Sequence, residues 1–171
     1  HAAATLRKKD PSLAFQLHIV GAGSMSQQLA KQCVSENLQD NVVFHGQVSD
    51  VRPLLNSAHI VLLTSASEGM PRSILEAMSM GKTCLASKVE GIDELIIDRK
   101  TGYLFDAHSQ NALVSQLLNI ISQSKLLKPR VVQEHISLNF DAKNNAAVAG
   151  FTVTPGIGAT TICLLYTSDA A

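Results

Sequence analysis

The sequence predicts an α/β domain of Rossmann-like, three-layer architecture, with a mostly parallel sheet of about five or six strands. Short apolar runs alternate along the chain with stretches of helical periodicity. The run Ile60-Val61-Leu62-Leu63 is apolar at every position, which is typical of a parallel strand buried on both faces. Tight, glycine-containing loops join strands to helices, so right-handed βαβ units are the expected connections.

The expected strands are short apolar segments bounded by polar residues or glycine, and the expected helices carry apolar residues at helical spacing. We expect strands over residues 16–21, 41–45, 59–64, 83–87 and 103–105, and helices over residues 2–9, 24–36, 51–57, 71–80, 92–100, 109–124 and 131–140. Ser24 is the expected N-cap of the second helix. Proline suits the first turn of the fourth helix, and Gly81 should end that helix as its C′ residue.

The start of the helix over residues 71–80 is the candidate functional site. A helix N-terminus exposes backbone N–H groups, and Met70, the nearest cap position, has no side-chain oxygen to accept from them. Such an end, preceded by Gly69 and following a parallel strand, suits an anion such as phosphate. Glu68 and Glu76 flank it, and carboxylates are suited to accept hydrogen bonds from sugar or ribose hydroxyls. The pattern therefore indicates a nucleotide-sugar pocket.

A simpler interpretation explains the same two glutamates without a ligand. Glu76 is placed to pair with Arg72 at i,i+4 spacing, which stabilises an exposed helix by roughly 0.2–0.5 kcal/mol. Glu68 fits an ordinary loop carboxylate. Spacing alone leaves both interpretations open.

The segment from Glu68 to Glu76, EGMPRSILE, resembles the E-x7-E signature of family-4-type retaining glycosyltransferases with the GT-B fold. In that family the signature lies in the C-terminal, donor-binding domain, which is the C-terminal half of the GT-B fold. The resemblance extends from about residue 17 to residue 140. It includes residues 19–23, residues 42–46, and residues 91–95 with the pair 101–102.

The resemblance implies roles for the candidate residues. Glu76 is expected to hold the ribose hydroxyls of a nucleotide-diphosphate sugar, and Glu68, the catalytic candidate, to contact the transferred sugar. The remaining candidates are backbone contacts to sugar and diphosphate (Gly69, Met70, Pro71, Arg72), contacts to the nucleobase (Gln47, Val48, Asp50) and a glycine of the first strand-to-helix turn (Gly23). Asp50 has a simpler interpretation as well, as a helix cap without a ligand.

The resemblance also implies the rest of the enzyme. We expect a hexosyl-type glycosyltransferase in the cytoplasm that needs no cofactor beyond its nucleotide-sugar donor. The acceptor domain, for a sugar or lipid, and two basic diphosphate-binding residues are expected on the amino side of His1. Peripheral membrane association is a further expectation for that missing domain. Residues 1–142 are then a truncated donor domain that is inactive alone. A GT-B-type nucleotide-sugar epimerase and a non-catalytic nucleotide-sugar-binding module are the alternatives.

Composition and spacing argue against other classes. Fourteen basic residues balance fourteen acidic ones and Trp is absent, so we expect no nucleic-acid partner. The six histidines and three cysteines show no metal-ligand spacing, and we expect no metal. Gly21-Ala22-Gly23 could begin the G-x-G-x-x-G fingerprint of NAD-binding domains, but its third glycine position is Ser26. This substitution argues against NAD binding.

Residues 143–171 change in character and leave the family pattern. They are poor in charge, rich in Ala, Gly and Thr, and their end resembles translated sequencing-adaptor sequence. We expect a disordered or artefactual tail without function, whose removal leaves the free energy of unfolding nearly unchanged.

Overall fold

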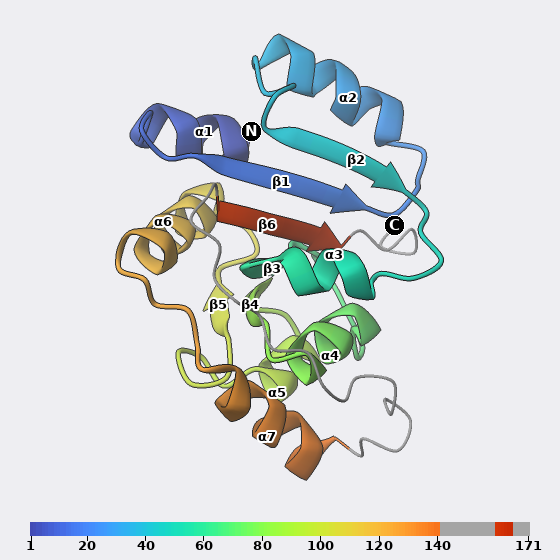
Figure 1. Ribbon diagram of the computed structural model, residues 1–171, viewed down its shortest axis with the longest axis vertical. Helices are drawn as coiled ribbons and strands as arrows, with labels where there is room; N and C mark the ends of the chain where they lie inside the picture. Colours follow the sequence, from blue (N-terminus) through green and yellow to red (C-terminus); the bar gives the residue numbers. More distant parts are fainter. Residues whose placement is uncertain (141–159, 166–171) are drawn as a thin grey trace.

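A six-stranded parallel sheet in the order β2-β1-β6-β3-β4-β5 forms the centre of the computed structural model, which describes residues 1–140 and 160–165 (Figure 1). The strands are β1 (Phe15–Val20), β2 (Val42–Gly46), β3 (Ile60–Leu63), β4 (Thr83–Ser87), β5 (Tyr103–Phe105) and β6 (Thr160–Leu165). The helices are α1 (Ala2–Lys9), α2 (Ser26–Ser35), α3 (Arg52–Ser57), α4 (Arg72–Ser79), α5 (Ile92–Leu95), α6 (Gln110–Ser122) and α7 (Pro129–Asn139). None of these helices is long and apolar enough to cross a membrane.

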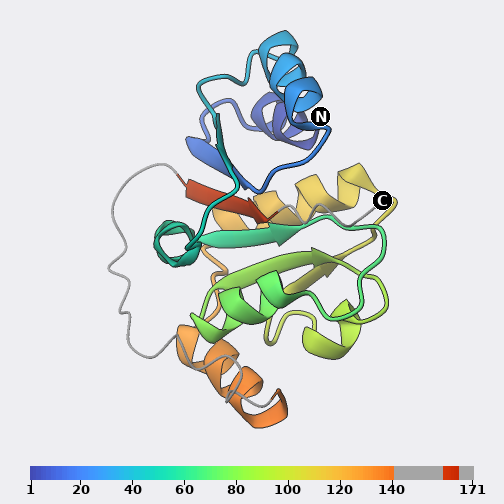
Figure 2. The same ribbon diagram turned by 90° about the vertical axis from the view of Figure 1, so that its right-hand side faces the viewer.

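Helices cover both faces of the sheet, so the structure has the three predicted layers (Figure 2). Successive residues of β3 point to opposite faces: Ile60 and Leu62 pack with residues of α1 and α6, while Val61 and Leu63 pack with residues of α3, α4 and α7. All four are buried, which explains the unbroken apolar run of this strand.

Most predicted elements are confirmed, and β4 has the predicted bounds. α4 ends as expected, with Gly81 at a φ of +71° directly after the C-cap residue. Two helices differ. α2 begins at Ser26 rather than after Ser24, and the Ser26 hydroxyl donates to the Gly23 carbonyl at 2.8 Å. α5 ends at Leu95, because Ile96 is extended and Asp98 forms a β-bridge with Gly102.

The tail differs most from its prediction. Six of its residues, Thr160–Leu165, form β6 in the middle of the sheet, parallel to β1 on one side and to β3 on the other. Their sequence, TTICLL, is rich in the β-branched and apolar residues that favour strands. Residues 141–159 and 166–171 lie outside the described part of the chain.

Candidate functional site

The carboxyl ends of β1 to β4 lie along one edge of the sheet, where ligands bind in open α/β folds. Two contacts hold the loops of this edge together. The Gly21 N–H donates to the Gly46 carbonyl at 2.8 Å and joins the loops after β1 and β2. The Ser87 hydroxyl donates to the Ser65 carbonyl at 2.5 Å and joins the loops after β3 and β4. The candidate residues from all four loops therefore share one edge.

The first turn of α4 is uncapped, as predicted, although its N-cap is Pro71 and not Met70. The N–H groups of Ile74 and Leu75 both donate to the Pro71 carbonyl, at 3.0 and 3.2 Å. Those of Arg72 and Ser73 have no acceptor among the described residues. Pro71 has no N–H, so the donors of the segment 69–72 belong to its other residues. The turn can receive an anion.

Ser73 lies in this first turn and was missed in the sequence. Its hydroxyl oxygen is buried and has no hydrogen-bond partner among the described residues. A short polar side chain in a helix gives no sequence signal for such a role, because serine also serves in caps and on exposed faces.

Glu68 lies half-buried in the loop between β3 and α4. Its Oε1 accepts a hydrogen bond from the Ser65 hydroxyl at 2.6 Å. The loop is also held from the other side by Gly91, where φ is +83°. A Cβ at Gly91 would stand 1.6 Å from the Gly69 carbonyl oxygen, so the two loops touch through their backbones. Gly91 thus fixes the loop that carries Glu68.

Glu76 is exposed on α4, on the turn after the helix start. The ion pair with Arg72 that the simpler interpretation requires is not formed: the described ion pairs are His1–Glu36, Arg52–Asp50, Arg99–Asp98 and Arg130–Glu134. Neither the Glu76 nor the Arg72 side chain has a hydrogen bond to another described residue. Both groups are therefore available to a ligand.

The three nucleobase candidates follow β2 and differ in their surroundings. Gln47 is exposed, whereas Val48 is half-buried against the core. Asp50 is engaged by Arg52, which donates to it from its backbone N–H at 3.0 Å and from its guanidinium at 2.8 and 2.9 Å. These hydrogen bonds hold the pKa of Asp50 below its usual range. Asp50 therefore accepts from the first residue of α3 without being its N-cap, which is Val51, while Gln47 is exposed to solvent.

A histidine pair next to this edge was also missed in the sequence. His18 on β1 and His45 on β2 stack with ring centroids 5.1 Å apart, and their Nδ1 and Nε2 atoms are 2.8 Å apart. Burial, with a smaller contribution from His45, lowers the pKa of His18. Only the pairing of β1 with β2 brings together two residues so far apart in sequence.

Lys82 marks the opposite edge of the sheet, at the start of β4. It is buried, and its ammonium donates to the Asn56 carbonyl in the last turn of α3 at 2.7 Å. Burial lowers the pKa of this amine. A cation at the C-terminal end of a helix stabilises it, so Lys82 serves the fold rather than the candidate site.

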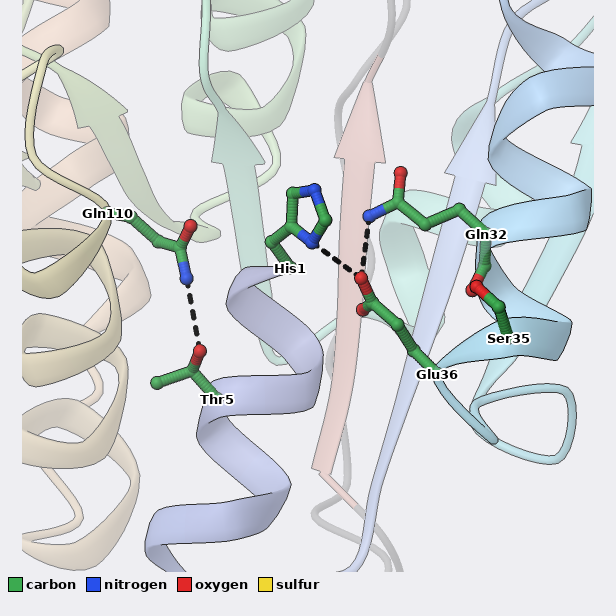
Figure 3. Close-up of polar contacts among 6 residues, drawn as sticks. All are labelled: His1, Thr5, Gln32, Ser35, Glu36 and Gln110. Carbon is green, nitrogen blue, oxygen red and sulfur yellow. Dashed lines mark hydrogen bonds and ion pairs between the residues drawn. The ribbon is translucent and has the colours of Figure 1, made fainter.

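An apolar cavity of about 300 Å³ lies between the sheet and helices α1, α2 and α6, apart from the α4 turn. At its rim His1 Nδ1 and Gln32 Nε2 both contact Glu36 Oε1, at 2.5 and 2.9 Å (Figure 3). Nearby, Gln110 of α6 donates to the Thr5 hydroxyl of α1 at 3.0 Å. Within the described ranges no cluster of three or more potential metal ligands occurs.

An all-parallel α/β sheet with helices on both faces defines a domain of the Rossmann-like class. The family model for group 1 glycosyl transferases matches residues 1–123. The chain belongs to this family.

Similar proteins carry glycosyltransferase names. A poly(ribitol-phosphate) α-N-acetylglucosaminyltransferase of Staphylococcus aureus is 32% identical over 70% of this chain and 24% of its own length. A UDP-Gal:α-D-GlcNAc-diphosphoundecaprenol α-1,3-galactosyltransferase of Escherichia coli is 28% identical over 79% of this chain and 33% of its own. The chain thus spans about a quarter to a third of these relatives.

Solved structures of GT-B glycosyltransferases share the fold. TarM matches with a TM-score of 0.74 and 26% identity over 84% of this chain and 29% of its own. The lipopolysaccharide galactosyltransferase WaaB matches with a TM-score of 0.70 and 26% identity over 82% of this chain and 40% of its own. A second TarM structure, at a TM-score of 0.71 and 27% identity over 84% of this chain and 29% of its own, is a complex that includes UDP. The expected GT-B relationship is confirmed.

Proposed function

We propose that this domain binds a nucleotide-diphosphate sugar at the carboxyl edge of its sheet, as the donor domain of a retaining, hexosyl-type glycosyltransferase. The observation that carries the proposal is the open first turn of α4, flanked by Glu68 and by a Glu76 that is not paired with Arg72. The free backbone N–H groups at the start of α4 can donate hydrogen bonds to the diphosphate. The carboxylates of Glu68 and Glu76 can accept hydrogen bonds from the sugar and ribose hydroxyls on either side of the diphosphate.

The spacing of the loops supports an extended ligand. Gln47 follows β2 and Glu68 follows β3, and these strands are three positions apart in the sheet. At about 4.8 Å per strand, their carboxyl ends lie roughly 14 Å apart. A nucleobase near Gln47, Val48 and Gly23 and a sugar near Glu68 fit this separation, with the diphosphate between them.

The names of similar proteins support a uridine nucleotide. The E. coli relative is named for UDP-galactose, and one TarM structure contains UDP. No cofactor beyond the donor is part of the proposal. An acceptor domain, which would bind a sugar or lipid and complete the enzyme, belongs to the proposed whole protein, and this domain alone is proposed to bind without transferring.

Glu76→Gln tests the proposal. If Glu76 accepts hydrogen bonds from ribose, its loss removes an interaction worth roughly 1.5–3 kcal/mol. Affinity for UDP, measured by calorimetric titration, should then fall by about ten- to a hundredfold. The free energy of unfolding should stay nearly constant, because Glu76 makes no ion pair with Arg72.

Glu134→Gln is the matched control, since Glu134 is an exposed helical glutamate that pairs with Arg130 at 2.7 Å. It should lose a few tenths of a kcal/mol of stability and leave UDP affinity unchanged. Equal UDP affinities in wild type and Glu76→Gln would remove the support for the site.

A further inference from the structure

The loop that carries Glu68 is held at two points by the loop between β4 and α5. Before Glu68 along the chain, the Ser87 hydroxyl donates to the Ser65 carbonyl at 2.5 Å. After Glu68, Gly91 lies against the Gly69 backbone, and a Cβ added at Gly91 would also stand 3.0 Å from the Glu68 carbonyl oxygen. Both contacts join positions that are 22 residues apart, so the two loops run side by side between them. Glu68 therefore lies between two fixed points.

Ser87 is the buried end of a chain of hydrogen bonds that reaches the Glu68 carboxylate. It is the last residue of β4 and is 1% exposed, so water does not compete for the bond that its hydroxyl donates. The side chain of Ser65 in turn donates to Glu68 Oε1 at 2.6 Å. The first bond holds the backbone of Ser65, and the second directs the carboxylate from that backbone. The place of the carboxylate thus depends on a hydroxyl on the neighbouring strand.

This chain of bonds matters because the described residues offer the Glu68 carboxylate no other partner. Glu68 belongs to none of the described ion pairs, and Ser65 donates the one side-chain hydrogen bond that it accepts within the described ranges. A glutamate side chain has several rotatable bonds and samples several rotamers unless contacts restrict it. A carboxylate that is already held in place loses less freedom when a ligand hydroxyl donates to it, so affinity is higher.

We propose that Ser87 is a positioning residue that sets the rotamer of Glu68 through Ser65, and thereby the affinity for the sugar part of the donor. The effect on the ligand rests on the proposed function, whereas the rotamer of Glu68 is a property of the free domain. Ser87 acts on the sugar side alone, because Gln47 and Glu76, proposed for the base and the ribose, lie outside the segment between the two contacts.

Ser87→Ala tests the proposal, and Thr83→Val is the matched control. Thr83 is also buried, begins the same strand, and its hydroxyl accepts from the Leu127 N–H at 2.9 Å. Each variant removes a hydrogen bond between a buried β4 hydroxyl and the backbone, but Thr83 lies at the end of β4 that is remote from Glu68. Ser87→Thr keeps the hydroxyl and should restore the behaviour of the wild type.

The first measurement is the set of side-chain three-bond couplings of Glu68, by NMR without ligand. We expect the couplings of one rotamer in the wild type, in Ser87→Thr and in Thr83→Val, and averaged couplings in Ser87→Ala. Ser87→Cys covers the case in which Ser87→Ala does not fold, because a thiol is similar in size and a weak donor, so averaging is expected there too. Unchanged couplings in Ser87→Ala, or in Ser87→Cys if the alanine variant does not fold, would overturn the proposal. So would averaged couplings in Thr83→Val.

The second measurement is calorimetric titration with UDP and with UDP-galactose, the sugar nucleotide in the name of the E. coli relative. Ser87→Ala should lower affinity for UDP-galactose by about three- to tenfold, the effect of one neutral hydrogen bond, and leave affinity for UDP unchanged. In a Glu68→Ala background, Ser87→Ala should cause no further loss, because it acts only through that carboxylate. An equal loss in both backgrounds would overturn the proposal. If Ser87→Ala averages the couplings while the wild type binds neither ligand, the positioning role stands and the proposed function fails.

Discussion

Glu68 and Glu76 differ in what they contact, and this separates the expected effects of their substitution. Glu68 is half-buried in the loop that faces the proposed sugar, and its carboxylate accepts a hydrogen bond from the Ser65 hydroxyl. Glu68→Gln should weaken binding of a UDP-sugar by about ten- to a hundredfold, since a hydrogen bond to a charged group contributes roughly 1.5–3 kcal/mol. Affinity for UDP itself should not change. Calorimetric titration with both ligands measures the difference.

Ser65→Ala is the matched control for Glu68, because it removes the hydroxyl that orients the carboxylate and leaves the charge. It should weaken UDP-sugar binding less than Glu68→Gln does. A parallel loss of UDP and UDP-sugar affinity in Glu68→Gln would contradict the assignment of Glu68 to the sugar.

His18 should make stability depend on pH. Its folded-state pKa is lowered by burial and by His45, so the folded protein binds a proton less readily than the unfolded chain. Its contribution to stability is therefore complete above the unfolded pKa of about 6.5 and is lost as pH falls toward the folded pKa. His18→Gln should flatten the decline in unfolding free energy between about pH 7.5 and pH 5, measured by denaturant titration.

His108→Gln is the control, because His108 is exposed on the turn before α6. His108→Gln should leave the decline in unfolding free energy with falling pH the same as in the wild type. The same slope in His18→Gln and wild type would show that the histidine pair does not couple to folding.

The sequence predicted residues whose role follows from their neighbours along the chain, and missed those whose role depends on distant ones. Glu68, Gly69 and Glu76 surround one helix start, so a local pattern places them. The pairing of His18 with His45 depends on strand register, and the buried hydroxyl of Ser73 depends on the packing around α4. Neither leaves a trace in a single sequence.

At the scale of elements, the loop before α4 depends on its contact with the start of α5. Gly91→Ala would place a Cβ 1.6 Å from the Gly69 carbonyl oxygen, at a φ of +83°. The loop must move, so we expect a loss of about 1–3 kcal/mol of unfolding free energy together with a loss of UDP-sugar affinity. Denaturant titration and calorimetry measure the two effects.

Gly81→Ala is the control for Gly91→Ala, because it adds a side chain at a strained backbone position away from the candidate site. Gly81 has a φ of +71°, and an added Cβ would meet Pro129 Cβ at 2.6 Å, at the opposite edge of the sheet. It should lower stability without lowering UDP-sugar affinity in the folded protein. If both variants lose stability and neither loses affinity, the contact between Gly91 and Gly69 does not position the site.

Elements were predictable where local and tertiary preferences agree. β3 is apolar on both faces because helices cover both, and α4 has helix-terminating residues at both ends. α5 is shorter than its pattern predicted, because the bridge between Asp98 and Gly102 draws the following residues into an extended path. Tertiary pairing overrides helical periodicity there.

For the whole molecule, β6 changes the expectation for the tail. A chain that ends at residue 159 loses a strand bonded on both sides, and β1 and β3 lose their common partner. We therefore expect its unfolding free energy to fall by more than about 2 kcal/mol, a large share of the stability of a small domain. Denaturant titration measures the change, and a chain that ends at Leu165, which keeps β6, is the control. If the chains that end at residue 159 and at Leu165 are equally stable, residues 160–165 do not contribute to the stability of the fold.

The sequence could not place β6, since a six-residue run rich in β-branched residues suits many positions. Its position depends on two strands that are far away along the chain and leave a gap between them. The same run read alone is only a segment of high strand propensity.

The position of β6 also bears on how the chain folds during its synthesis. β1 begins at Phe15 and its central neighbour begins at Thr160, so every residue between them must leave the ribosome before these strands can meet. Such distant pairing raises the contact order and slows folding. Until then one side each of β1 and β3 remains an unpaired edge that can pair with other chains. The nascent chain is thus most exposed to aggregation in the interval after β3 has been made and before β6 has been made.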